Sequence, residues 1–307
     1  MTDPGTPRRA VGIDIGSNTF SFAAVERRGD AVTVTQDASL AVRLSEGLAP
    51  GGRLRPIAVA RCLAVLGDVA GRFGVPGVPV RAVGTQALRM AADPEVFTRP
   101  ARDLIGTEIE IVDGAEEARL VFRGGTLGLP LDGPLVVVDV GGQSTELCWR
   151  DRGGVLVPLS IPFGVVGLTE RFFTSDPPGS DEVAALERHA AAVVDEAIPR
   201  GLEGEVLGVA GTATSLGALE VCPGEWRRDA IHGLAVTRER LRHWLGVMAG
   251  ISSAERTRRY GIGDARADVF LAGLVILDAV LARLGRRGMR ISVNGLRVGA
   301  ALSILEG

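Results

Sequence analysis

The sequence predicts an α/β protein built from two similar halves. An apolar, strand-like run that ends in an aspartate and a glycine turn occurs twice, at residues 11–20 and 135–147, with Asp14 and Asp139 in equivalent places. The two aspartates are 139 − 14 = 125 residues apart, so each run heads a segment of domain size. Short apolar runs also alternate with segments of helical period in both halves, which is typical of the α/β class.

The composition limits the possible functions. A chain of 307 residues with 46% apolar and 23% charged residues is an ordinary globular protein of about two domains. Its net charge of −3 argues against binding to nucleic acid or to a membrane surface. All 34 basic residues are Arg, so neither a P-loop nor a kinase-type phosphate lysine is possible. The N-terminus has no apolar segment typical of a signal peptide.

The cysteines and histidines indicate neither disulfides nor a zinc site. Cys62, Cys148 and Cys222 are isolated and odd in number, and the three histidines lack metal-ligand spacing. A reducing, cytoplasmic location fits this pattern. The longest apolar run, 269–277, is too short for the roughly 20 residues of a membrane span and predicts a buried helix.

The first half is predicted to follow the order β-β-β-α-β-α-β. Its clearest element is the helix over 56–73, because the apolar positions keep a helical period between Pro56 and Gly74. A helix that begins at residue 86 carries Arg89, and Asp93-Pro94 is expected to cap the next helix. The strands are expected within 10–26 and 31–44, where three form a meander, and at 80–83 and 108–112.

The second half repeats this alternation. It begins at Leu135, after a helix over 115–127 that opens with Glu116 and Glu117, acidic residues that the positive end of the helix dipole favours. Four polar residues are each expected to cap a helix: Ser180, Thr237, Ser253 and Asp264. The strands are expected at 135–140, 144–150, 155–162, 205–209 and 289–293, and further helices at 165–173, 180–198 and 295–305.

The turn after the second aspartate has the composition of a phosphate-binding loop. Gly141 and Gly142 can adopt a positive φ and let an anion approach the backbone, and the hydroxyls of Ser144 and Thr145 can donate to phosphate oxygens. Asp139 would hold a divalent cation against that phosphate. An ordinary β-hairpin whose Asp and Gly only make the turn explains this stretch equally well when it is taken alone.

The repeat makes the phosphate-binding interpretation stronger. Two strand-Asp-Gly units suggest a duplicated fold with a phosphate clamped between its halves. A third glycine loop, at 208–215, follows an apolar strand and opens a helix, whose N-terminus favours an anion.

Six motifs carry a resemblance to a known family. They are D-I-G-S-N-T-F at 14–20, G-T-Q-A-L-R at 84–89, E-E-A-R-L at 116–120, D-V-G-G-Q-S-T-E-L at 139–147, A-G-T-A-T-S at 210–215 and N-G-L-R-V-G at 294–299. With these motifs the chain resembles the exopolyphosphatase and guanosine pentaphosphate phosphohydrolase family over nearly its whole length. The resemblance implies the duplicated ribonuclease H-like fold of acetate kinase, sugar kinases, actin and heat-shock chaperones, with two domains and a cleft between them.

In the resembled fold the two halves exchange their terminal helices. This implies a first domain of residues 1–125 with 295–307, and a second domain of residues 126–294. The final helix, from about Gly295, should then pack on the first domain.

The resemblance also assigns roles to single residues. It makes Glu117 the base that activates water and Arg89 a phosphate-holding residue, with Mg²⁺ or Mn²⁺ near Asp14, Asp139 and Glu146. The loops would bind the phosphate chain through Gly16, Ser17, Asn18, Thr19, Gly141, Gly142, Gln143, Ser144, Thr145, Gly211 and Thr212. Like charge from the polyphosphate and nearby acids should raise the pKa of Glu117, partly offset by the metal. Without the resemblance, a dipole-matched first turn explains Glu116 and Glu117, and a surface salt bridge explains Arg89.

Three positions depart from the family pattern. Gln143 stands where many members have a third glycine, so the loop is expected to be stiffer and an amide to reach the phosphate site. Ala115 precedes the two glutamates where a polar residue is frequent. Val298 stands near the C-terminus where the family usually has a glutamate. In its length, the chain resembles the short, two-domain members of the family.

The expected activity is Mg²⁺-assisted release of orthophosphate from inorganic polyphosphate, since phosphoanhydride hydrolysis needs charge neutralisation and an oriented water. Removal of the 5′-phosphate from guanosine pentaphosphate is the alternative within the same class. A sugar-kinase-like or actin-like ATP binder and a weakly catalytic nucleotide-binding regulator are alternatives from other classes. Glu116-Glu117 favours hydrolysis, because a sugar kinase needs a separate hydroxyl-activating Asp that the sequence does not reveal. The sequence leaves open whether the protein forms a homodimer.

Overall fold

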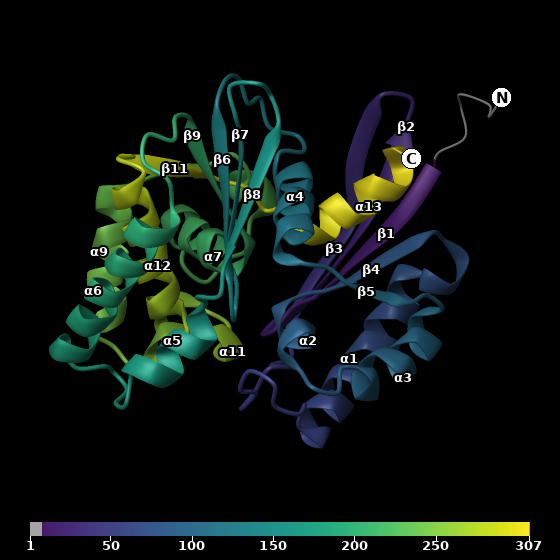
Figure 1. Cartoon of the computed structure of the whole chain (residues 1–307), viewed down its shortest axis with the longest axis horizontal. Helices are drawn as coiled ribbons and strands as arrows, with labels where there is room; N and C mark the ends of the chain where they lie inside the picture. The colour runs from purple at the N-terminus through teal and green to yellow at the C-terminus, as the bar shows by residue number, and fades with distance from the viewer. Residues whose placement is uncertain (1–7, 307) are drawn as a thin grey trace. The chain divides into compact units, whose positions relative to one another are not determined.

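The computed structural model describes residues 8–306, which divide into two compact units. The first unit extends to Gly125 and resumes at Gly295, and the second is Thr126–Asn294. Each unit contains one mixed sheet with helices packed on it, as Figure 1 shows for each. The α/β class predicted from the sequence is therefore confirmed.

The first unit contains a five-stranded sheet of order β3-β2-β1-β4-β5. Its strands are β1 (Arg8–Ile15), β2 (Thr19–Arg28), β3 (Ala31–Ala41), β4 (Val80–Gly84) and β5 (Ile109–Ile111). The central strand β1 pairs antiparallel with β2 and parallel with β4. β1, β2 and β3 form the meander that the alternating sequence predicted.

The alternation of side chains along β1 separates the two faces of this sheet. Val11, Ile13 and Ile15 belong to one buried cluster with residues of α1 (Pro56–Phe73) and α3 (Glu95–Ile105). Gly12 lies on the opposite face, where a Cβ atom would be 1.8 Å from the carbonyl oxygen of Arg297 in α13 (Leu296–Glu306). The last helix therefore packs directly on β1. It also packs against α4 (Gly114–Gly125), and both helices are visible beside the sheet in Figure 1. The remaining helices of the unit are η1 (Val75–Gly77) and α2 (Gln86–Met90).

The second unit repeats this pattern in a sheet of order β10-β11-β9-β6-β7-β8. Its strands are β6 (Leu135–Val140), β7 (Thr145–Arg150), β8 (Leu156–Ile161), β9 (Glu205–Val209), β10 (Ala235–Thr237) and β11 (Gly288–Ile291). Here β6 pairs antiparallel with β7 and parallel with β9, as β1 does with β2 and β4. The duplicated, ribonuclease H-like arrangement is confirmed by this repeated topology.

Eight helices belong to the second unit, and most of them pack against the last one, α12. They are α5 (Val165–Phe172), α6 (Ser180–Ala197), α7 (Ala210–Val221), α8 (Arg228–Ile231), α9 (Arg238–Ala249), α10 (Ser253–Tyr260), α11 (Asp264–Ala267) and α12 (Phe270–Arg283). α12 is buried without interruption from Phe270 to Leu281, which confirms the buried helix predicted from the apolar run. Across residues 8–306, no helix combines the length and the apolar character needed to cross a membrane.

Of the predicted helix caps, Thr237 is confirmed, because its hydroxyl accepts from Arg240 N at the start of α9. Ser180 and Asp264 are wrong, since the N-cap residues of α6 and α11 are Gly179 and Gly263 and the predicted residues already lie within the helices.

The predicted caps Ser253 and Asp93 are also wrong. Ser252, rather than Ser253, caps α10, because its hydroxyl accepts from Glu255 N while the Glu255 carboxylate accepts from Ser252 N. Ser253 instead contacts Asp176, with its N–H 2.9 Å from Oδ1. Asp93 does not cap α3 either, since its carboxylate accepts the backbone N–H of Leu54. Asp93 and Ser253 therefore each bond to a residue that is distant in sequence, Leu54 and Asp176, instead of capping a helix.

Candidate active site

The two glycine turns predicted to bind phosphate have the same local structure. In the β1–β2 turn, Gly16 N donates to Thr19 O at 3.1 Å, and in the β6–β7 turn Gly141 N donates to Ser144 O at 2.9 Å. A Cβ atom on Gly16 or Gly141 would lie 2.6 or 2.9 Å from that same carbonyl oxygen. Neither glycine has a positive φ, so the positive φ predicted for Gly141 is wrong. The close approach of the backbone across the turn excludes a side chain at both positions.

The second turn is fastened to the start of α5. The carbonyl oxygens of Gly141 and Gly142 accept from the backbone N–H groups of Val165 and Val166, at 3.0 and 2.7 Å. Because N–H and C=O point in opposite directions across a trans peptide, the N–H groups that follow these carbonyls point away from α5. These N–H groups, of Gly142 and Gln143, are the backbone donors that the turn can present to an anion.

Two of the polar side chains of this turn, those of Gln143 and Thr145, contact the protein. Thr145 Oγ1 donates to Phe163 O at 2.6 Å, so its only proton is used within the fold. The amide oxygen of Gln143 is 3.2 Å from where a Cβ atom of Gly167 in α5 would lie. Thr145 is therefore not a hydroxyl donor to phosphate in this arrangement, and Gln143 packs on α5.

Two carboxylates face each other at the end of β6. Asp139 and Glu146 are directly opposite in the antiparallel register of β6 and β7, and Ser160 donates to Glu146 Oε1 at 2.8 Å. Glu146 is buried, and its Oε2 would be 3.9 Å from a Cβ atom of Gly141. Like charges at opposite positions of a sheet repel each other, and a bound cation relieves that repulsion.

These oxygen ligands fit Mg²⁺ or Mn²⁺. No group of three or more His, Cys, Asp and Glu side chains that could hold a metal occurs among the residues described. Mg²⁺ does not need such a cage, because it keeps several waters and takes one or two carboxylates together with substrate phosphates. Asp139 and Glu146 match that requirement in the second unit.

Asp14 occupies the equivalent place in the first unit. It lies opposite Ser21 in the register of β1 and β2, and its Oδ1 would be 3.7 Å from a Cβ atom of Gly16. The backbone of this turn is held by the segment after β3, because Asn18 O accepts from Val42 N and Arg43 N. Asp14 therefore lies beside the first glycine turn as Glu146 lies beside the second.

Arg89 and Glu117 form a buried ion pair in the first unit. Arg89 Nη1 donates to Glu117 Oε2 at 2.7 Å and to the carbonyl oxygen of Val112 at 2.7 Å. Its Nε and Nη2 both donate to Gln86 Oε1. Arg89 is thus not the surface salt bridge that the sequence left open, since α2 and the end of β5 hold it against α4.

The protonation of Glu117 is set by burial. Its side chain is 9% exposed, and this burial raises the pKa of Glu117 above its ordinary value, while the charge and hydrogen bond of Arg89 offset part of the rise. Burial thus raises this pKa in the predicted direction, and the further rise expected from a bound polyphosphate stays a prediction. A carboxylate with a raised pKa is better suited to accept a proton near neutral pH.

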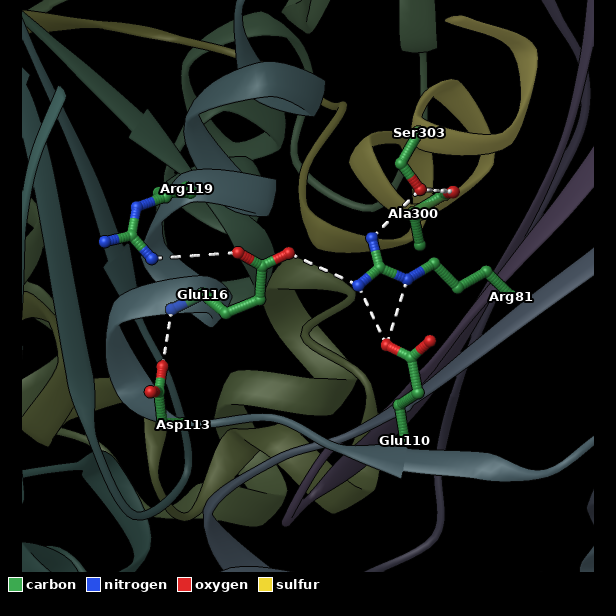
Figure 2. A network of polar contacts seen from close by, with 7 residues as sticks. All are labelled: Arg81, Glu110, Asp113, Glu116, Arg119, Ala300 and Ser303. Carbon is green, nitrogen blue, oxygen red and sulfur yellow. Dashed lines mark hydrogen bonds and ion pairs between the residues drawn. The ribbon is translucent and has the colours of Figure 1, made fainter. Parts of the chain in front are cut away.

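Glu116 points to different partners, as Figure 2 shows. Its carboxylate contacts Arg81 Nη2 at 3.2 Å and Arg119 Nη1 at 3.7 Å, and its N–H donates to Asp113 Oδ1 at 2.7 Å. Its side chain is 36% exposed. The adjacent glutamates are therefore directed apart, and only Glu117 contacts Arg89.

The third loop presents an arginine that the sequence did not indicate. Ala210, the first residue of α7, has a positive φ of 58°, and a Cβ atom on Gly211 would be 2.6 Å from Cζ of Arg266. Arg266 Nη1 also donates to Ser215 Oγ at 3.2 Å. Thr212, a predicted phosphate ligand, packs its side chain against the position of a Gly273 Cβ instead. The loop thus combines a helix N-terminus with a guanidinium.

The two other departures from the family pattern lie in the first unit. Val298 in α13 is completely buried, so an apolar residue suits this position. Ala115 is in the first turn of α4, between the Asp113 cap and Glu116. The predicted residues accordingly fall into one set in the first unit (Asp14, Gly16, Ser17, Asn18, Thr19, Arg89 and Glu117) and one in the second (Asp139, 141–145, Glu146, Gly211 and Thr212).

Comparison with known proteins gives the family. A sequence model of the Ppx/GppA phosphatase family matches residues 25–307, which is most of the chain. The chain belongs to the Ppx/GppA phosphatase family. Exopolyphosphatase 2 of Mycobacterium tuberculosis is 31% identical to it over 316 residues, covering 96% of this chain and 98% of that protein.

Other Ppx/GppA members differ in length or identity. The guanosine-5′-triphosphate,3′-diphosphate pyrophosphatase of Aeromonas hydrophila is 27% identical over 300 residues, which cover 95% of this chain but 58% of that protein. The crystal structure of the Aquifex aeolicus Ppx/GppA family member superposes with a TM-score of 0.83 at 27% identity, covering 98% of each chain.

Proposed function

We propose that the protein is an exopolyphosphatase that releases orthophosphate from the end of inorganic polyphosphate. The observation that carries this proposal is the correspondence with an exopolyphosphatase over almost the whole length of both chains. The buried Arg89–Glu117 pair supports it, because hydrolysis of a phosphoanhydride needs a group that removes a proton from water.

In this proposal Glu117 is the general base. Water attacks the terminal phosphorus, its proton passes to Glu117, and the bond to the bridging oxygen breaks, so that the shortened chain leaves with that oxygen. Arg89 would orient the terminal phosphoryl group after exchanging one of its present acceptors for a phosphate oxygen. The backbone N–H groups of the glycine turns would bind the remaining phosphates.

A divalent cation would be held by Asp139 and Glu146 in the second unit, and Asp14 is the corresponding carboxylate of the first unit. Mg²⁺ or Mn²⁺ supplies charge neutralisation for the phosphate chain when it is bound. Arg266 beside Gly211 would add a fixed positive charge for a phosphate at the third loop. The carboxylates would otherwise repel the polyanion, so activity should depend on the metal.

Guanosine pentaphosphate is the second candidate substrate. The Aeromonas hydrophila relative favours it, since that protein is named for a guanosine substrate. The match covers 58% of that relative but 98% of exopolyphosphatase 2, and this fuller correspondence favours polyphosphate. A weakly catalytic regulator of the same fold would instead bind ATP or another nucleotide with little turnover.

We also propose that the two compact units are the two ribonuclease H-like domains, residues 1–125 with 295–307 and residues 126–294. The three free cysteines fit a reducing cytoplasm as the location. A homodimer is proposed as the assembly to test by analytical ultracentrifugation.

The test is phosphate release by the purified protein. The protein is incubated with Mg²⁺ and polyphosphate, guanosine pentaphosphate or ATP, each with and without excess EDTA. We expect release from polyphosphate to be fastest and to stop with EDTA. Release from guanosine pentaphosphate alone would favour the second substrate, and binding without release would favour a regulator. Undiminished hydrolysis in EDTA would contradict the metal-dependent mechanism.

A further inference from the structure

Two arginines of one segment bind two adjacent glutamates of another. Arg81 on β4 and Arg89 on α2 belong to the same stretch of chain, which runs from the sheet into the short helix. Glu116 and Glu117 are neighbours in the first turn of α4. Arg81 contacts Glu116 and Arg89 contacts Glu117, at 3.2 and 2.7 Å. The two ion pairs therefore fasten the first turn of α4 at two points on the same segment.

The local sequence does not decide which glutamate faces Arg89. Both carboxylates lie in the first turn, where the helix dipole favours either of them equally. Consecutive residues of a helix point about 100° apart, so a turn rotated by about that angle would direct Glu116 toward Arg89 and Glu117 away from it. Some contact outside this turn has to fix its rotation.

Arg81 can fix the rotation of this turn, because other residues hold its side chain in place independently of Glu116. Its Nε and Nη2 donate to Glu110 Oε2 on β5 at 3.1 and 2.8 Å, and its Nη1 donates to Ser303 Oγ on α13 at 3.0 Å. Ser303 in turn donates to the carbonyl oxygen of Ala300, and Figure 2 shows these contacts around the Arg81 guanidinium. Arg81 thus presents a fixed cation that Glu116 must meet.

We propose that Arg81 is a positioning residue for Glu117, which it selects by binding Glu116. With Glu116 held by Arg81, the first turn of α4 has one rotation, and Glu117 is the carboxylate that meets Arg89. The inference rests on the proposed role of Glu117 as the general base. It adds that the neighbouring acid and its arginine determine where that base lies.

This role differs from a contribution to overall stability. The Arg81–Glu116 pair is partly exposed, and such pairs contribute little to the free energy of unfolding. Displacement of a catalytic group by about 1 Å can cost as much as 10²-fold in rate. Loss of Arg81 should therefore reduce turnover much more than it reduces stability.

The test compares Arg81→Met with two matched controls. Glu110→Gln removes a charge beside Arg81 but keeps an oxygen that accepts from its guanidinium, and Arg119→Met removes the other cation that contacts Glu116. We expect Arg81→Met to lower kcat for polyphosphate about tenfold with little change in KM, while both controls stay within about twofold of the wild type. Arg81→Lys, which keeps a cation for Glu116, should recover most of the turnover. An equal loss in Arg81→Met and Arg119→Met would contradict the proposal.

A double-mutant cycle tests whether Arg81 acts through Glu116. Glu116→Leu should reproduce the loss of Arg81→Met, and the double variant should lose no more than either single variant. Independent, multiplying losses would show that Arg81 acts in another way. Glu116→Gln keeps an oxygen that accepts from Arg81 and should retain most activity.

A readout without turnover separates this inference from the proposed function. The carboxyl of Glu117, labelled with ¹³C, is titrated by NMR in the wild type and in Arg81→Met; Arg89 is the charged group bonded to it. Release of the turn should admit water, so the carboxyl should titrate at lower pH in the variant, because burial is what raises its pKa. An unchanged titration would overturn the positioning role even if the wild type hydrolyses polyphosphate. If the wild-type protein hydrolysed no polyphosphate, the proposed function would be wrong. The titration of Glu117 would still test whether Arg81 positions this residue.

Discussion

Replacing Gly299 by alanine should destabilise the first unit, because α13 and α4 approach each other there without room for a methyl group. A Cβ atom on Gly299 would lie 1.9 Å from the carbonyl oxygen of Leu120, and one on Gly124 would lie 2.0 Å from that of Gly295. Cβ atoms essentially never approach another heavy atom within 3.0 Å, so the helices would have to separate by at least 3.0 − 1.9 = 1.1 Å.

The size of the effect follows from two opposing contributions. Overpacking costs about 1–3 kcal/mol, and this clash is with backbone atoms that no rotamer change relieves, so the upper value applies. Alanine gains about 1 kcal/mol over glycine in a helix. The free energy of unfolding should therefore fall by about 2 kcal/mol, or roughly 4–8 °C in Tm at about 2–4 °C per kcal/mol.

Thermal and urea unfolding followed by far-UV circular dichroism measure this change. Gly71→Ala in α1 is the matched control, since it is exposed and a Cβ atom there would meet nothing within 4 Å. It should stabilise the protein by about 0.5–1 kcal/mol through helix propensity alone. If Gly299→Ala unfolded at the same temperature as Gly71→Ala, or above it, the close crossing of α4 and α13 would be refuted.

Two further perturbations address the metal and the pH dependence. Asp139→Asn removes one carboxylate ligand, so the Mg²⁺ concentration needed for half-maximal activity should rise about 10-fold or more. The Tm should stay within about 2 °C of the wild type, because the residue lies at a strand end. An unchanged Mg²⁺ dependence of phosphate release would show that Asp139 is not a metal ligand. Glu182 caps α6 and accepts from Thr174 and Gly179, and these hydrogen bonds lower its pKa to about 2. A lowered pKa means that the stabilisation is present above the ordinary value of 4.5 and is lost as the pH falls toward 2. Wild type should accordingly be more stable than Glu182→Gln at pH 7, and the difference in urea midpoint should vanish between pH 4.5 and about 2; a constant difference would contradict the assignment.

The elements that the sequence predicts best are those whose boundaries depend on local chemistry. α1 begins at Pro56 and ends before Gly74, whose φ of 65° is the left-handed cap that glycine favours. β6 and α12 were recognisable as apolar runs, because strands and helices surrounded by other elements need no polar face. Short elements such as α8 and β10 were not predicted, since three or four residues carry too little periodicity.

The candidate site was predictable in its positions but not in its contacts. Asp14 and Asp139 lie at strand ends because each apolar run stops there. The partners of Arg89 and Glu116 could not be predicted, because Val112 and Arg81 are brought to them by the pairing of β4 with β5 and by the packing of α4. Arg266 was missed for the same reason: it is far in sequence from Gly211, and nothing in its own neighbourhood indicates an anion site.

Glu117, and not Glu116, is the proposed general base. Glu117→Gln and Glu116→Gln make the same change at adjacent positions, one buried against Arg89 and one shared between Arg81 and Arg119. Turnover of polyphosphate at saturating Mg²⁺ is the measurement, with KM determined in parallel. Glu117→Gln keeps size and hydrogen bonding but cannot take a proton, so kcat should fall roughly 10²–10⁴-fold with KM largely kept, whereas Glu116→Gln should stay close to the wild type. An inactive Glu116→Gln, or near-normal turnover in both variants, would contradict the account.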